Sequence, residues 1–114
     1  MSANQTLWVL GQKVTYVETI GDYSLLEVSA TPSIPGPPPH YHEDAAELFH
    51  VIEGALEVLN DGSWHTLKPG DSLTVPRKGI HTFKNRVSTT TRFITTWSPK
   101  GFESTETAKV CATF

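Results

Sequence analysis

Residues 36–54 read GPPPHYHEDAAELFHVIEG and are the most informative stretch of this sequence. The prolines before His40 fix φ and lack an N–H, so they predict an extended segment at a sheet edge or in a loop. In an extended chain alternate side chains point to the same face, so the imidazoles of His40 and His42 project together. Glu47 follows five residues later, opens a strand-like run and can bring a carboxylate toward that face. The stretch therefore predicts two imidazoles and a carboxylate in one place.

Residues 70–85 read GDSLTVPRKGIHTFKN and add a third imidazole, that of His81, just after a Pro/Gly turn. Three neutral imidazoles and one carboxylate suit Fe(II), Mn(II), Co(II), Ni(II), Cu(II) or Zn(II), and the ligand set does not choose among these ions. We predict one divalent transition metal per chain, bound by His40, His42, Glu47 and His81. Four protein ligands on a six-coordinate metal leave two positions for substrate or for substrate plus O2. Glu47 either ligates the metal or leaves it to act as a general base.

The rest of the sequence alternates between short β-like runs and tight turns. We expect strands at 14–17, 23–29, 47–53, 55–59, 63–67, 72–75, 80–84 and 91–97. Asn60-Asp61-Gly62 predicts a hairpin turn, because these residues tolerate positive φ. Thr, Val and Ile supply 29 of the 114 residues, and such side chains favour strands. The expected fold class is all-β, although Ser98-Pro99 resembles the start of a helix.

Length and composition limit the remaining possibilities. A chain of 114 residues has room for one domain. The net charge of −3 argues against a nucleic-acid surface, and no run approaches the ~20 apolar residues of a membrane span. The start carries no basic segment typical of a signal peptide. Cys111 is the one cysteine, so it cannot form an internal disulfide, and we expect a cytoplasmic protein.

The two quoted stretches resemble the two motifs of the cupin superfamily, which lie on neighbouring strands of a small β-barrel. The spacings that match the family are His42 to Glu47 to Gly54, Gly70 to Pro76, Pro76 to His81, and His81 to Asn85. Two glycines depart from the family pattern. Gly36 stands closer to the histidines than is usual, and Gly79 is displaced by one residue. These departures concern turn geometry, whereas the ligand positions match.

The resemblance implies a double-stranded β-helix (jelly-roll) barrel in a single cupin domain over residues 1–114, with its core at about 14–97 and a tail at 98–114. Within the family, the sequence most resembles small, quercetin-dioxygenase-like cupins. This resemblance implies a dioxygenase that acts on a small enolisable or aromatic hydroxylated molecule, with Glu47 as the catalytic base. A metal-assisted isomerase or lyase and a non-catalytic small-molecule-binding protein are the alternatives. The resemblance also implies a homodimer joined through edge strands near the N-terminus.

Parity along the strands separates residues near the predicted site from the others. Phe49 and Val51 share the parity of Glu47, and Phe83 that of His81, so these three line a substrate pocket or pack in the core. His50 has the opposite parity and points away from the site. We expect His65 to be solvated or to lie at an interface, and Glu43 and Asp44 to be solvated loop acids or to supply a substitute ligand. Asn85 is expected to order a turn, and Trp64 is expected to be a packing residue.

Three aromatic residues near the C-terminal end are less constrained by the pattern. Phe93 and Trp97 share parity on the last predicted strand and face either the cavity or the opposite sheet. Phe102 is an apolar residue in a polar tail, and it is a candidate lid over the barrel mouth.

Overall fold

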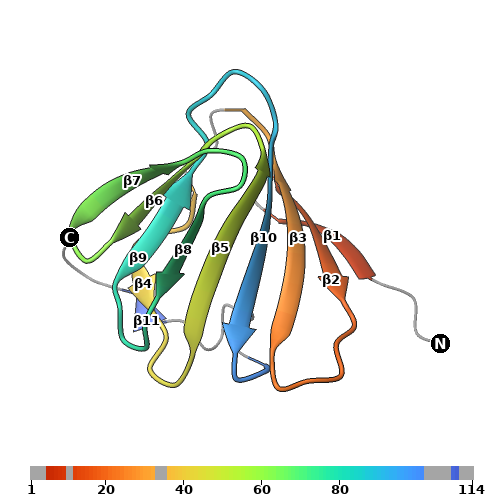
Figure 1. Ribbon diagram of the computed structural model, residues 1–114, viewed down its shortest axis with the longest axis vertical. Coiled ribbons are helices and arrows are strands. Elements are labelled where there is room, and N and C mark those ends of the chain that lie inside the picture. The colour runs from red at the N-terminus through yellow and green to blue at the C-terminus, as the bar shows by residue number, and fades with distance from the viewer. Residues whose placement is uncertain (1–4, 10–11, 33–35, 102–108, 111–114) are drawn as a thin grey trace.

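The computed structural model describes residues 5–9, 12–32, 36–101 and 109–110, and every regular element in these ranges is a β-strand. The strands are β1 (Gln5–Val9), β2 (Gln12–Val17), β3 (Ser24–Ala30), β4 (His40–Tyr41), β5 (Ala46–Glu53), β6 (Leu56–Asn60), β7 (Ser63–Leu67), β8 (Ser72–Val75), β9 (His81–Lys84), β10 (Thr91–Ser98) and β11 (Lys109–Val110) (Figure 1). The predicted all-β class is confirmed. Within these ranges no helix has the length and apolarity that a membrane span requires.

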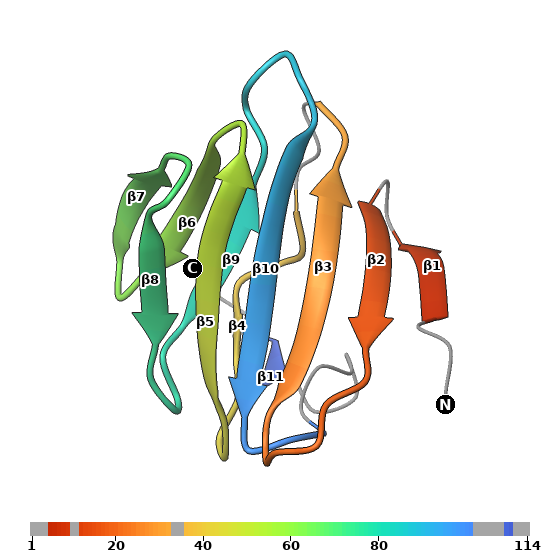
Figure 2. The ribbon, with the colours of Figure 1, turned by 45° about the vertical axis from the view of Figure 1, so that its right-hand side comes forward.

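The strands form two antiparallel sheets that face each other as the layers of a jelly roll (Figure 2). One sheet has six strands in the order β1-β2-β3-β10-β5-β8, and the other has five in the order β11-β4-β9-β6-β7. Strands far apart in sequence become neighbours: β10 pairs with both β3 and β5, and β4 pairs with β9. The pairing of β4 with β9 places residues 40 and 81 side by side.

The space between the sheets is filled by alternate side chains of the central strands. Strands β3, β5 and β10 bury every second residue, which is the period expected for a sheet with one face on a core. Phe49, Phe83 and Phe93 form an aromatic cluster with ring centroids 5.4 to 6.1 Å apart. Burying a phenylalanine side chain contributes roughly 2–3 kcal/mol, so this cluster is a main source of stability.

Local turn chemistry holds the strand register. Asp61 and Gly62 have φ of 52° and 81°, and Asn60 pairs with Ser63 across the turn. Two consecutive positive φ angles are the signature of the tight hairpin turn whose twist matches the flanking strands. The predicted hairpin at these residues is therefore confirmed.

Two expectations about the chain need correction. Ser98 does not start a helix: it is the last residue of β10 and pairs with Ala46 of β5, because the hydrogen-bonded ladder of this central strand continues one residue beyond the predicted end. The strands β1, β4 and β11 were not predicted, since two of them are only two residues long. Phe102 and Cys111 lie outside the described residues.

Candidate metal centre

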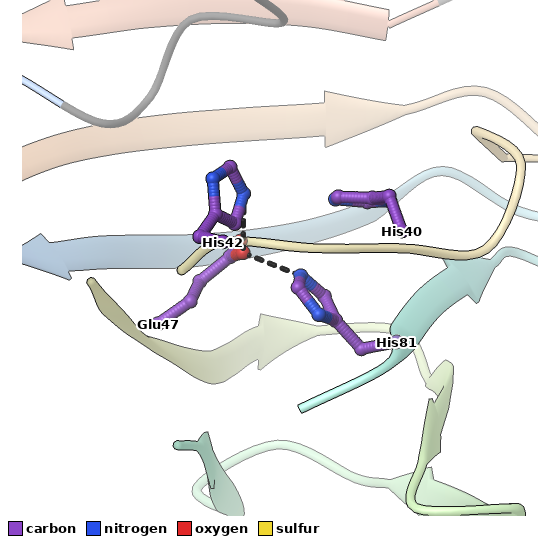
Figure 3. Close-up of side chains that lie close together, drawn as sticks. All are labelled: His40, His42, Glu47 and His81. Carbon is purple, nitrogen blue, oxygen red and sulfur yellow. Dashed lines mark hydrogen bonds and ion pairs between the residues drawn. The ribbon is translucent and has the colours of Figure 1, made fainter. Parts of the chain in front are cut away.

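Four polar side chains predicted to converge do lie together between the two sheets (Figure 3). His40 comes from β4, His42 follows that strand, Glu47 comes from β5 and His81 begins β9. One ligand-type atom from each lies within 4.8 Å of the corresponding atoms of the other three. All except His40 are buried, with exposed fractions of 4% or less.

The proline-rich segment is laid directly on β9, which brings His40 to His81. Gly36 has φ of +76°, and a Cβ on it would stand 1.7 Å from the carbonyl oxygen of Phe83, so only glycine fits. The hydroxyl of Thr82 donates a hydrogen bond to the carbonyl of Pro37. The segment then continues into β4, where His40 is the register partner of His81.

Backbone carbonyl groups and the turn before β9 hold the three histidines in place. The N–H of Lys78 donates to the carbonyl of His42 at 2.7 Å, which ties the end of the first motif to the second. Nδ1 of His81 lies 2.9 Å from the carbonyl of Gly79, and Nδ1 of His40 lies 2.9 Å from that of Pro38. A carbonyl only accepts, so in both rings Nδ1 carries the proton and Nε2 is the nitrogen left for a ligand.

The Glu47 carboxylate lies beside the rings of His81 and His42, and its two oxygens have different partners. Oε1 lies 2.8 Å from Nε2 of His81 and 3.9 Å from Nε2 of His42. Oε2 accepts a hydrogen bond of 2.8 Å from the hydroxyl of Thr95 on β10. A buried charge needs such partners, and here it has them.

The pKa values of His40 and His81 are shifted in opposite directions. Burial by itself lowers the pKa of His81, but the hydrogen bond to Glu47 and the negative charge of Glu47, together with the Gly79 carbonyl, outweigh it and raise that pKa. Burial and the neighbouring His81 lower the pKa of His40 against the opposing effects of Pro38 and Glu47. These shifts favour the protonated form of His81 beside Glu47 and the neutral form of His40.

The donor set fits a divalent transition metal. Imidazole nitrogens and a carboxylate oxygen are the ligands such ions prefer, and the ring centroids of the three histidines lie 4.3 to 5.7 Å apart. Three imidazoles this close cannot all be protonated, so a dication is a better occupant than protons. A cation bound by the four residues would replace the proton that His81 and Glu47 share.

The predicted pocket residues are part of the packed interior. Phe49 and Val51 are fully buried, and Phe83 is partly buried against the same core. The ring of Phe49 lies 6.2 Å from that of His81, so the aromatic cluster forms the wall on that side of the centre. Contact between these residues and a substrate stays a prediction.

Several residues expected outside the site lie where the pattern put them. His50 faces outward from β5, with Nδ1 2.6 Å from the hydroxyl of Ser72. His65, Glu43 and Asp44 are exposed, so neither acid belongs to the group. Trp64 is 45% exposed and lies under the ammonium group of Lys84, at 3.9 Å, so it packs against a cation and not in the core.

Asn85 orders the loop after β9, as the sequence predicted. Its Nδ2 donates to the carbonyls of Ala30 and Thr89 at 3.0 Å, and its Oδ1 accepts from the N–H of Val87 at 3.1 Å. The side chain is fully buried. It therefore joins this loop to the end of β3 and takes no part in the metal centre.

Two residues of β10 complete the surroundings of the centre. Thr95 was not singled out from the sequence, although a polar residue with the inward parity of Phe93 and Trp97 was a signal that could have found it. Trp97 faces the interior: it is 6% exposed, and its ring lies edge-on to that of His42 with centroids 6.4 Å apart. Its buried indole N–H has no hydrogen-bond partner among the residues that the structure describes.

Comparisons with known proteins agree with this architecture. A family model described as "Cupin domain" matches residues 28–97, which include all four residues of the centre. Quercetin 2,3-dioxygenase of Bacillus subtilis (strain 168) is 40% identical over 45 residues, which make up 40% of this chain and 13% of that protein. The chain thus spans a small part of this relative's length.

Solved structures resemble the chain over most of its length. KdgF from Halomonas sp. superposes with a TM-score of 0.77 at 25% identity, covering 88% of each chain. An RmlC-like cupin from Shewanella frigidimarina has a TM-score of 0.74 at 24% identity, covering 84% of each chain. These likenesses establish the barrel fold.

Proposed function

Since the chain belongs to the cupin family, we propose that it is a metal-dependent enzyme that oxidises a small enolisable or aromatic hydroxylated molecule as a dioxygenase. The observation that carries the proposal is the convergence of His40, His42, Glu47 and His81 within 4.8 Å. The partial likeness to a quercetin 2,3-dioxygenase supports the choice of reaction.

The four residues would hold one divalent transition metal. When bound, this ion supplies Lewis acidity toward adjacent substrate oxygens and, if redox-active, access to O2 chemistry. Glu47 is the residue that we assign to accept a proton from the substrate, because it is the one carboxylate of the group. The packed aromatic residues beside His81 keep water from that side of the centre.

Elemental analysis and oxygen uptake test the proposal. We expect about one transition-metal ion per chain in protein purified from its native host, and O2 consumption when quercetin or a β-diketone is added. Glu47→Gln should abolish uptake, because the amide is not a base. Wild-type protein that contains no metal after native purification would contradict the proposal.

A metal-assisted isomerase or lyase is the second candidate, and the buried carboxylate of Glu47 in the same group favours it. A Glu47 carboxylate released from the ion can take a proton from one substrate atom and return it to another without any redox step. Turnover under argon separates the two candidates, since an isomerase or lyase forms product without O2 and a dioxygenase does not. If the loaded protein binds such molecules and converts none, it is a binding protein.

We further propose that the protein is a homodimer. Strand β1 is an outer strand of the six-stranded sheet, and unpaired strand edges favour pairing with another chain. Light scattering coupled to size exclusion should give twice the chain mass of 12.6 kDa. A mass equal to one chain would contradict this.

A further inference from the structure

Thr95 stands out among the residues next to the centre because its buried hydroxyl donates a hydrogen bond to the carboxylate of Glu47. The side chain is 3% exposed and points inward from β10, between the aromatic core and Trp97. Its Oγ1 donates to Oε2 of Glu47 at 2.8 Å. A valine of nearly the same shape would fill this position without a polar group to satisfy.

The strand register makes this contact specific. Thr95 pairs with Phe49 and Trp97 pairs with Glu47, so Thr95 and Glu47 are diagonal neighbours on the inner face of the β5–β10 pair. A β-branched side chain in a strand has few allowed χ1 values. Burial restricts it further, and the hydroxyl is therefore held in place before any ion binds.

The hydrogen bond from Thr95 gives the two carboxylate oxygens of Glu47 different roles. Oε2 is turned toward β10 by Thr95, whereas Oε1 is turned toward the histidines, 2.8 Å from Nε2 of His81 and 3.9 Å from Nε2 of His42. A carboxylate free to rotate could offer both oxygens to a cation or neither. With Oε2 hydrogen-bonded to Thr95, the carboxylate offers only Oε1 to a cation.

We propose that Thr95 is the positioning residue of the metal centre, which makes Glu47 a ligand through Oε1 alone and keeps the remaining coordination positions open for substrate. This rests on the proposed function, because it requires that the four residues bind a metal. It goes beyond that function in assigning different roles to the two oxygens of Glu47 and a role to a residue that is not a ligand.

The test uses Co2+ added to the metal-free full-length protein, with two readouts that do not depend on turnover. These are the dissociation constant for Co2+, measured against a chelating dye, and the visible absorption of bound Co2+, which responds to the number and geometry of its ligands. The variants are Thr95→Val, which removes the hydroxyl, and Thr95→Ser, which keeps it. Thr91→Val is the matched control, because Thr91 is a buried inward residue of the same strand whose hydroxyl bonds to Ala55 and not to Glu47.

Thr95→Val should weaken Co2+ binding about 10- to 100-fold, the range seen when a partner of a metal ligand is removed, and change the absorption bands. Thr95→Ser should restore wild-type affinity and spectrum, and Thr91→Val should lower only thermal stability. If Thr95→Val does not fold, Thr95→Ala makes the same test with a smaller side chain.

Three results would overturn the proposal. Wild-type affinity and spectrum in Thr95→Val would show that the hydroxyl does not position the carboxylate. An equal loss in Thr91→Val would show general damage to the strand. Absence of Co2+ binding by the wild-type protein would refute the proposed function itself, and this outcome is recognised before any variant is made.

Discussion

The imidazoles of His40 and His81 lie opposite each other across the β4–β9 pair, with ring centroids 4.3 Å apart and planes inclined by 51°. Two positive charges at this separation repel strongly, so at most one of the two rings carries a second proton. Glu47 decides where that proton resides, because it contacts Nε2 of His81 directly. The centre is thus asymmetric before any cation arrives.

This asymmetry predicts how the stability of the metal-free protein changes with pH. The pKa of His81 is raised in the folded state, so the stabilisation from its pairing with Glu47 is fully present below about pH 6.5 and is lost as pH rises through the raised pKa. The loss appears as a lower free energy of unfolding at pH 9 than at pH 6.5. Urea unfolding in EDTA at pH 6.5 and pH 9, compared with His81→Asn, measures it.

The lowered pKa of His40 acts in the opposite direction, since neutral His40 favours the fold and its protonation below pH 6.5 disfavours it. The two effects occupy different pH ranges and can be separated. A stability difference between wild type and His81→Asn that grows above pH 7 would disprove the assignment of the shared proton.

Loss of one ligand imidazole should empty the centre. His42→Gln removes a nitrogen from a buried position where the amide cannot replace it, and we expect metal content to fall at least tenfold, as measured by mass spectrometry of the purified protein. His65→Gln is the matched control, because His65 is exposed on β7. Full metal occupancy in His42→Gln would exclude His42 as a ligand.

The approach of the proline segment to β9 predicts a large effect at Gly36. Gly36→Ala puts a Cβ 1.7 Å from the carbonyl oxygen of Phe83, so the segment must move and stability should fall by more than about 3 kcal/mol. Gly70 also has positive φ, but no atom of the described residues lies within 4 Å of its Cβ position. Gly70→Ala should therefore cost only about 1–2 kcal/mol. Equal midpoints of thermal unfolding would contradict this comparison.

The buried amide of Asn85 predicts a loss of stability without a loss of metal binding. Asn85→Ala removes one accepting and three donating contacts inside the barrel, which should cost roughly 2–4 kcal/mol. The affinity for Co2+ should remain within about twofold once the variant is folded, since none of the hydrogen bonds found for Asn85 in the described part of the chain goes to the four residues. Chemical denaturation and dye competition give the two numbers, and parallel losses in both would connect this loop to the centre.

The convergence of the four polar residues was predictable because it depends on short-range rules. The i, i+2 spacing of His40 and His42 fixes their common face, and the turn residues before His81 mark where its strand begins. The match to the spacings of the two cupin motifs then predicts that the strands carrying them lie side by side, although they are distant in sequence. The hairpin at Asp61 was predictable for the same local reason.

What escaped prediction depends on tertiary contacts. Strand β4 is two residues long and follows prolines, and it becomes a strand only because β9 and β11 lie beside it. The position of Ser98 at the end of β10 depends on its partner Ala46. The hydrogen bond from Thr95 to Glu47 requires the register of two strands 48 residues apart in sequence, which no local pattern contains.

Trp97, which lies inside the barrel edge-on to His42, has a practical consequence. Indole fluorescence is quenched by nearby paramagnetic ions, so arrival of Co2+ or Cu2+ at the histidines should dim its emission, whereas Zn2+ should leave most of it. Trp64 is partly exposed, and changing it to phenylalanine would reduce the background signal. The protein thus contains an intrinsic optical reporter of occupancy that needs no dye.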